Sequence, residues 1–213
     1  MSDAGGDAGG EPAPDGEAAG RHFRDEDWYG EDLGAVRFVD CTFTDVDLSE
    51  VTTAGAHFES CTFHGGRFNA STHRSTAFVA CDFRRVSFFD ATFEGCKLLG
   101  SSFADCTLRP IRVRGGQWRG VTIRGANLGG LDLSGLDLRD ADLSLSSLAR
   151  TVLRGARLDG ASLRETDLSG ADLRGAGLER VDLAAARLSR TRLDLAGAVA
   201  LAEQHGAEVD ASA

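Results

Sequence analysis

The sequence predicts an all-β solenoid, a narrow rod of stacked coils, from two periodic patterns. From Leu33 to Leu193 every fifth residue is large and apolar, except at Thr53 and His73. Two positions before each of these, a small or β-branched residue stands in nearly every repeat. A helix buries residues with a period of 3.6 and a strand with a period of 2, so a period of five fits neither. It fits short extended pieces joined by sharp corners, with one large and one small side chain per side pointing inward.

The first twenty residues lack this pattern. They consist mostly of Gly, Ala, Pro and acidic residues, with nothing large to bury, so we expect residues 1–20 to form a disordered acidic tail. They also lack the basic start and apolar middle of a secretory signal. No apolar run in the chain approaches the roughly 18 residues that span a bilayer. The sequence therefore predicts a cytoplasmic protein.

The five-residue register stops after Leu193, and a short helix is predicted over residues 195–206, followed by a flexible tail over 207–213. Asp194 can cap its N-terminus and Gly206 can follow its C-terminus. A broad apolar stripe consists of Leu195, Val199, Leu201 and Ala202. A helix this short needs a packing partner. The helix is therefore expected to cover the open end of the solenoid and to join two copies into a homodimer, because the stripe is too wide for one narrow coil.

Several repeats read A-(D/N)-L-x-x, as in Ala126-Asn127-Leu128, Ala141-Asp142-Leu143 and Ala171-Asp172-Leu173. In this the chain resembles the pentapeptide-repeat family over about residues 21–195. The resemblance implies a right-handed quadrilateral β-helix over residues 21–194, with 20 residues per coil. That spacing would stack Phe43, Phe63, Phe83 and Phe103 on one face, and leucines further along the rod.

The side chains that could carry chemistry are better explained as core filling. All five cysteines fall in the small inward column, without the close C-x-x-C pairs of zinc sites: Cys41, Cys61, Cys81, Cys96 and Cys106. His73 lies in the large inward column, where a hydrogen-bonded core histidine is the favoured interpretation. No nucleophile elbow, phosphate loop or dinucleotide motif is present. We therefore expect a protein that is not an enzyme and uses no cofactor or metal.

Acidic residues gather on the predicted outer surface of the C-terminal half. Asp132, Asp137, Asp140 and Asp142 lie close together in the sequence, opposed within that window only by Arg139. A 20-residue coil would put Asp132 and Asp172 on one face, and Asp142 and Asp182 on another. The cluster is either a solvated face or a partner-binding surface. The formal net charge of −10 disfavours direct nucleic-acid binding.

Four further segments resemble the fluoroquinolone-resistance members of the family, namely its mycobacterial members and the Qnr group. These segments are Arg21–Asp27, Cys106–Ile111, Val152–Ala156 and Ala198–Gly206. The resemblance implies a non-catalytic DNA mimic that binds DNA gyrase, with topoisomerase IV as a further candidate, and confers resistance to quinolone-type or other topoisomerase poisons. It also implies dimerisation through the C-terminal helix, and Pro110 matches a kink-forming proline.

Two other interpretations stay open. A structural scaffold with an unrelated protein partner is the main alternative, because a fold does not determine a function. Direct nucleic-acid binding through the arginine columns is the weaker one. The distribution of charge over the faces should discriminate between them, since mimicry needs a continuous negative face, nucleic-acid binding a positive stripe, and a scaffold a mixture.

Overall fold

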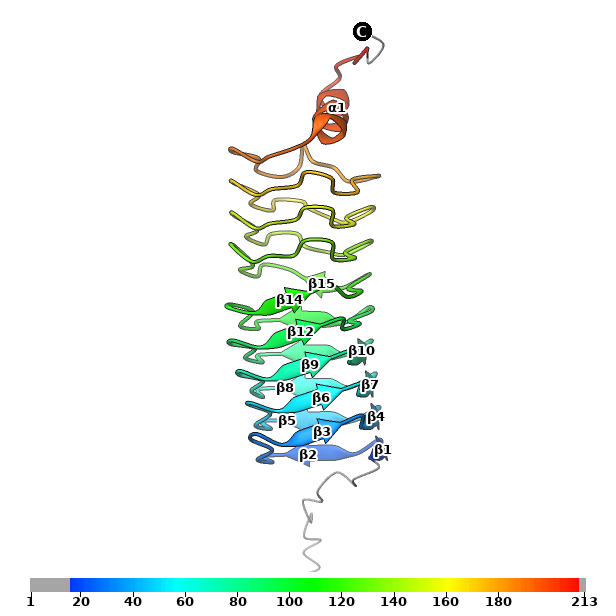
Figure 1. Cartoon of the computed structure of the whole chain (residues 1–213), viewed down its shortest axis with the longest axis vertical. Helices are drawn as coiled ribbons and strands as arrows, with labels where there is room; N and C mark the ends of the chain where they lie inside the picture. Colours follow the sequence, from blue (N-terminus) through cyan, green and yellow to red (C-terminus); the bar gives the residue numbers. More distant parts are fainter. Residues whose placement is uncertain (1–15, 211–213) are drawn as a thin grey trace, which may run out of the picture.

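The computed structural model describes residues 16–210, which form a rod of stacked coils with one helix across its C-terminal end (Figure 1). The strands are two or three residues long, because each side of a coil is only one pentad wide. They are β1 (Glu17–Ala19), β2 (His22–Arg24), β3 (Asp32–Gly34), β4 (Arg37–Val39), β5 (Thr42–Thr44), β6 (Thr52–Ala54), β7 (His57–Glu59), β8 (Thr62–His64), β9 (Thr72–Arg74), β10 (Ala77–Val79), β11 (Asp82–Arg84), β12 (Thr92–Glu94), β13 (Ser102–Ala104), β14 (Arg112–Arg114) and β15 (Thr122–Ile123).

All strand pairs are parallel, and almost all join residues 20 positions apart, as Phe43 with Phe63 and Phe58 with Phe78. The strands form three sheets, in the orders β1-β4-β7-β10, β15-β13-β11-β8-β5-β2 and β14-β12-β9-β6-β3. On the fourth side, isolated bridges such as Asp27 with Asp47 keep the same spacing. The predicted quadrilateral β-helix with 20 residues per coil is therefore confirmed.

The four sides are named here by their first coil, and each continues every 20 residues along the chain. The β1 face starts with residues 16–20, the β2 face with 21–25, the bridge face with 26–30 and the β3 face with 31–35. Corner residues such as Asp40, Asp45 and Gly65 have positive φ, which explains the frequent glycine at the last position of a pentad.

Both inward columns are buried over most of the rod, as predicted, and are partly buried at Cys106, at Val113 and in the last coil. On the β2 face the phenylalanine rings stack in register, with centroids 4.5 Å apart for Phe43 and Phe63 and 4.8 Å apart for Phe63 and Phe83. Neighbouring faces meet edge to face, as Phe78 does with Phe83. Leucines such as Leu143 and Leu163 continue the column in the C-terminal half, so one core runs along the rod.

The first coil starts earlier than the boundary predicted at residue 21. Strand β1 pairs with β4, and Ala18 lies beside Phe38 at the inward position of the register. The Gly16 carbonyl accepts a hydrogen bond from the Arg37 amide at 2.6 Å. The sequence does not mark Ala18 as an inward residue, because the other residues of this column are large and apolar. The rest of the expected tail, residues 1–15, lies outside the described residues, as do residues 211–213.

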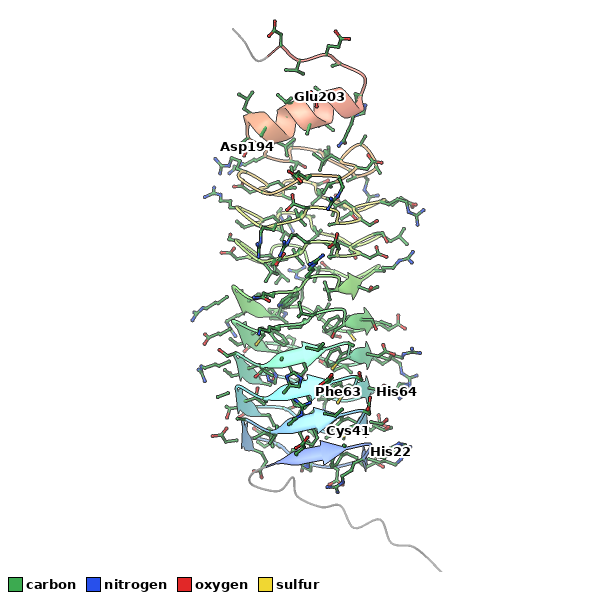
Figure 2. All side chains as sticks on the ribbon, turned by 90° about the vertical axis from the view of Figure 1, so that its right-hand side faces the viewer. His22, Cys41, Phe63, His64, Asp194 and Glu203 are labelled. Atoms are coloured by element: carbon green, nitrogen blue, oxygen red, sulfur yellow. The ribbon has the colours of Figure 1, made fainter. Side chains whose placement is uncertain are left out.

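Helix α1 (Leu195–Gln204) crosses the end of the last coil, with Asp194 at its start and Glu203 near its end (Figure 2). Asp194 accepts a hydrogen bond from the Gly197 amide at 2.9 Å, as expected of the N-cap. Gly206 follows the C-terminus with φ of +83°. The helix thus ends two residues before the predicted limit of 206. In the part of the chain that the structure describes, no helix is long and apolar enough to cross a membrane.

Pro110 lies where the pairing between coils is interrupted. The Arg109–Pro110 peptide bond is cis. Bridges join Ser87 to Thr107 and Asn127 to Ser147, but within residues 16–210 none joins Thr107 to Asn127. The sheet on the β2 face continues past this coil through β13 and β15, so the interruption is confined to part of the coil.

Candidate interaction surfaces

The interior of the rod is filled, and the sulfur atoms are part of the filling. Cys41, Cys61, Cys81 and Cys96 are buried, while Cys106 is half-buried. Each thiol contacts backbone carbonyls, as Cys96 Sγ does with the His73 carbonyl at 3.2 Å. Burial raises the pKa of Cys96 and Cys106 to about 11, which leaves both as unreactive thiols at neutral pH. Within residues 16–210 no three His, Cys, Asp or Glu side chains are grouped for metal binding.

His73 is also a core residue. Its ring is fully buried, with Nδ1 2.8 Å from Thr53 Oγ1 and Nε2 3.0 Å from Ser71 Oγ. Thr53 Oγ1 in turn lies 2.7 Å from Thr76 Oγ1. Burial lowers the pKa of His73 to about 3, so the ring is neutral and its two nitrogens are satisfied by hydroxyl groups.

Two of the predicted partner-binding aspartates are buried and neutralised by arginine. Asp137 is 3% exposed and lies 2.8 Å from both Arg139 and Arg157. Asp172 is 6% exposed and lies 2.7 Å from both Arg174 and Arg154. Hydrogen bonds from these guanidinium groups, with Arg139 and Arg174 the strongest, hold the pKa of each carboxyl below its usual range. These carboxylates present little charge to a partner.

The other four predicted aspartates are more accessible. Asp140 pairs with Arg119 at 2.9 Å, and Asp142 lies 3.6 Å from Arg124. Asp132 and Asp182 have no ion-pair partner among residues 16–210. They instead accept backbone hydrogen bonds, from Ser134 at 3.0 Å and from Ala185 at 3.2 Å.

The coil register separates these six residues instead of gathering them. Asp132 and Asp172 lie on the β3 face, Asp137 and Asp140 at the β1 face, and Asp142 and Asp182 on the β2 face. Each of the four faces carries acidic and basic residues in nearly equal number. Many of these pair across adjacent coils, as Arg67 does with Asp47 at 2.7 Å. Within the described rod, no face is continuously negative.

The helix residues predicted to join two copies differ in exposure. Leu195 is 79% exposed, which is the largest exposed fraction among the exposed large apolar side chains. Val199, Leu201 and Ala202 are half-buried, and Leu201 packs against the core of its own chain. Gly197 is buried, where an added Cβ would lie 3.2 Å from a Leu193 methyl group. The helix therefore uses one side to cap the rod and leaves Leu195 open to solvent.

Sequence reasoning missed Gln204, which closes the backbone of the last coil. Its amide oxygen accepts hydrogen bonds from the Leu183 amide at 2.8 Å and the Ala184 amide at 3.2 Å, and its Nε2 donates to the Val181 carbonyl at 2.7 Å. Asp194 likewise accepts from the Gly175 amide at 2.7 Å. No sequence pattern identifies this role, since a single glutamine at the end of a helix has no distinctive spacing.

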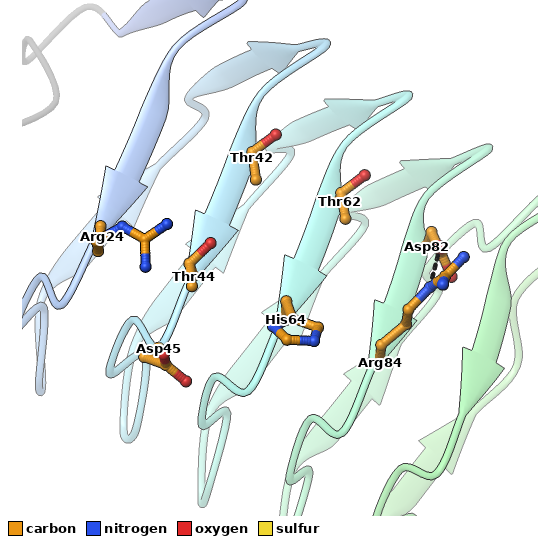
Figure 3. A pocket seen from close by; sticks show the side chains of 8 residues that line it. All are labelled: Arg24, Thr42, Thr44, Asp45, Thr62, His64, Asp82 and Arg84. Atoms are coloured by element: carbon orange, nitrogen blue, oxygen red, sulfur yellow. Dashed lines mark hydrogen bonds and ion pairs between the residues drawn. The ribbon is translucent and has the colours of Figure 1, made fainter.

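An open groove of about 640 Å³ lies on the β2 face near the N-terminal end (Figure 3). Arg24, Thr44, His64 and Arg84 stand one above another on successive coils along it. Thr42 and Thr62 form a second, shorter row beside them. No sequence pattern marks these residues, because Thr and Arg are common at the outward positions of a solenoid.

Comparison with known proteins agrees with this architecture. The family described as "Pentapeptide repeats" matches residues 119–160, 141–179 and 161–196, with eight copies of the repeat. Residues 119–196 therefore match the pentapeptide-repeat family. The pentapeptide repeat protein MfpA of Mycolicibacterium smegmatis is 49% identical over 49 residues. That match spans 23% of this chain and 26% of the relative, about a quarter of its length.

Solved structures of this fold extend the comparison over most of the rod. A trypsin-treated variant of QnrB1, a plasmid-mediated fluoroquinolone resistance protein, has a TM-score of 0.76 at 18% identity, covering 90% of this chain and 99% of that one. Full-length QnrB1 has a TM-score of 0.63 at 18% identity, covering 89% and 99%. At this identity the likeness shows the shared fold.

Proposed function

We propose that this chain is a non-catalytic, cytoplasmic protein that binds DNA gyrase, with topoisomerase IV as a further candidate, and protects it from quinolone-type or other poisons. The observation that carries the proposal is the combined similarity to MfpA in one segment and to the fluoroquinolone-resistance protein QnrB1 in overall fold. A filled rod with open, solvent-facing hollows suits binding of a macromolecule better than conversion of a small substrate.

The ion pairs leave few uncompensated carboxylates on this rod that could take the place of DNA phosphates. Duplex DNA carries one negative charge per about 1.7 Å of its axis, whereas the faces of this rod are mixed. Mixed faces do not favour imitation of DNA by a continuous negative surface, so we propose that gyrase instead contacts local carboxylates that stay unpaired, Asp132 and Asp182, with Asp140 and Asp142 as weaker contributors. We expect Asp137 and Asp172 to stabilise the rod instead of contacting gyrase, because arginine already compensates their charges.

A gyrase supercoiling assay tests the proposal. The purified protein at micromolar concentration should inhibit supercoiling or restore it in the presence of ciprofloxacin. Asp132→Asn with Asp182→Asn should weaken that effect and its dependence on salt, because the change removes charge at nearly constant shape. Asp40→Asn with Asp105→Asn is the matched control, removing two exposed charges from other coils. If the protein neither inhibits nor rescues, the gyrase proposal is wrong.

The second candidate is a scaffold for an unrelated protein, and a specific observation favours it. A near balance of charge on every face is the pattern expected of a scaffold, and it gives nucleic acid no continuous positive stripe. In a pull-down from cell extract, a scaffold should retain a partner other than a topoisomerase while leaving supercoiling unchanged. Direct nucleic-acid binding is not part of either proposal.

A further inference from the structure

The bridge face separates its charges along the axis of the rod. Its part up to residue 90 is mostly acidic, with Glu26, Asp27, Asp47, Glu50 and Asp90 against Arg67. Its part from residue 106 onward is mostly basic, with Arg109, Arg150, Arg187 and Arg190 against Asp167. The face is nearly balanced in total, but its two halves carry opposite charges.

Four of these charges stand in one column, at the corner between the bridge face and the β3 face. They are Glu50, Asp90, Arg150 and Arg190. Arg150 and Arg190 are exposed and have no ion-pair partner among residues 16–210. Glu50 is exposed and accepts a hydrogen bond from the Tyr29 hydroxyl at 2.6 Å, while Asp90 is half-buried beside Arg112 at 2.7 Å. The basic end of the column is therefore free to meet carboxylates of another molecule.

The positions in this column are self-complementary. With residues 16–35 counted as the first coil, Glu50 lies in the second coil, Asp90 in the fourth, Arg150 in the seventh and Arg190 in the ninth. A second copy can run antiparallel, with a two-fold axis across the face between the fifth and sixth coils. Each column then meets the same column of the other copy, so Glu50 faces Arg190 of the second copy and Asp90 faces its Arg150.

The same arrangement matches the charges of a second column, which the isolated bridges join along the face. It opposes Asp47 with Arg187 of the second copy, and Arg67 with its Asp167. Within one chain Asp47 pairs with Arg67 at 2.7 Å, and Asp167 lies 3.8 Å from Arg187. The contact would therefore join two ion pairs into one network of four charges.

Side-chain size matches as well. Phe89 is 54% exposed and would face the small Ala149 of the second copy, and Arg109 would face its Gly129. The interrupted pairing in the coil of Pro110 lies at the two-fold axis, so the regular coil spacing on either side of it stays equal.

Other arrangements of the bridge face bring like charges together. A shift by one coil opposes Asp47 with Asp167 in one direction and Arg67 with Arg187 in the other. A parallel pair would oppose Asp47 with Glu50 of the same coil. The charges therefore select one orientation and one register.

The other three faces lack this property. The same overlap, from the second coil to the ninth, opposes like charges on each of them: Glu59 with Asp159 on the β1 face, Asp82 with Asp142 on the β2 face, and Arg74 with Arg174 on the β3 face. Since like charges in contact are unfavourable, the bridge face alone suits a second copy in this overlap.

We propose that two copies of this chain pack side by side and antiparallel through their bridge faces, from the second coil to the ninth. This face is about 38 Å long and about 10 Å wide, smaller than the roughly 800 Å² per partner of a standard interface. We therefore expect a weak pair that salt dissociates. The contact is independent of gyrase binding, because Asp132 and Asp182 lie on other faces.

Sedimentation equilibrium at low salt and hundreds of micromolar protein tests the pair. A Leu195→Asp background removes any contact through the C-terminal helix, and this parent should still associate. Glu50→Arg or Arg190→Glu should each weaken association about tenfold or more, because the symmetry opposes like charges twice. The double variant should restore association, since it exchanges the two partners. Glu50 and Arg190 both have positive φ, so the exchange puts no new residue type at such a corner.

Asp105→Arg is the matched control, because it reverses a charge at an exposed corner of the β2 face with positive φ, and it should leave association unchanged. Small-angle X-ray scattering should show a pair longer than one rod by about 15 Å or less, whereas an end-to-end pair would be nearly twice as long. Association that ignores the single reversals, or a double variant that stays monomeric, would overturn the proposal. So would a monomeric parent that binds oligothymidylate through Arg150 and Arg190, because the basic half would then serve an external polyanion.

Discussion

Thr53 and His73, the two exceptions to the large apolar column, are partners in adjacent coils. They are 20 residues apart, so the register stacks them and lets Thr53 Oγ1 contact His73 Nδ1 at 2.8 Å. Ser71 and Thr76 complete the hydrogen bonds. The pair replaces a stacked phenylalanine with a polar contact that is fully satisfied, which makes the two substitutions compatible with a buried position.

The neutral state of His73 predicts a loss of stability in acid. Its pKa in the folded protein is about 3, below the ordinary value of 6.5, so the unfolded state binds the proton more readily between these values. The free energy of unfolding should therefore fall as the pH drops from about 6.5 toward 3, by up to about 1.4 kcal/mol per pH unit from this group. Urea denaturation of the protein and of His73→Phe at several pH values measures the difference. Equal pH dependence in both proteins would contradict the assignment.

Gly115 and Gly116 are neighbours with different structural demands. Gly115 has φ of +60° and open space around it, whereas at Gly116, with φ of +116°, an added Cβ would lie 2.5 Å from the Cys96 carbonyl oxygen. Gly115→Ala should lower the free energy of unfolding by about 1–2 kcal/mol, from backbone strain alone. Gly116→Ala should lower the free energy of unfolding by about 3 kcal/mol or more, because the backbone at Cys96 must also move to make room for the Cβ. Chemical denaturation of the two variants makes the comparison, and equal losses would argue against the close contact.

At the level of elements, helix α1 replaces the coil that would come next. A solenoid end leaves strand backbone unpaired, and Gln204 supplies an acceptor for two amides and a donor for one carbonyl of the last coil. The helix thus closes the edge through one side chain as well as through packing of Leu201 on the core.

Gln204→Ala should therefore destabilise the last coil. We expect a loss of about 1–3 kcal/mol, because buried backbone groups lose their partner. Hydrogen exchange should show faster exchange at the Leu183 and Ala184 amides. Glu203→Ala, at the neighbouring exposed position, should change stability by less than about 0.5 kcal/mol. If both variants behave alike, the helix caps by packing alone.

At the level of the whole molecule, the rod with its C-terminal helix leaves Leu195 uncovered, and we propose that a second copy covers it. A two-fold pairing presents the same helix surface to itself, which is the simplest closed arrangement for such a patch. Leu195 would be central to this contact, with Val199 and Ala202 beside it. Leu201 contributes less than its sequence position suggests, because it already packs on its own chain.

Leu195→Asp should convert the proposed dimer into a monomer without unfolding the rod, since each coil is held by its neighbours. Sedimentation velocity at tens of micromolar measures the change, and circular dichroism checks the fold. Ala196→Asp, at the adjacent exposed helix position, serves as the control and should remain dimeric. A monomeric unmodified protein at that concentration would show that the helix is an end cap only.

The sequence by itself determined the solenoid, the two inward columns and the positions of the cysteines, because burial in a repeat depends on local spacing. The family resemblance added the 20-residue coil, which the pairing of Phe43 with Phe63 confirms. Only the tertiary structure decided which carboxylates are free. Asp137 and Asp172 look like exposed acids in the sequence, yet arginines up to 20 residues away, such as Arg157, compensate them. Such pairing depends on which side chains adjacent coils bring within reach, and a five-residue period does not specify that.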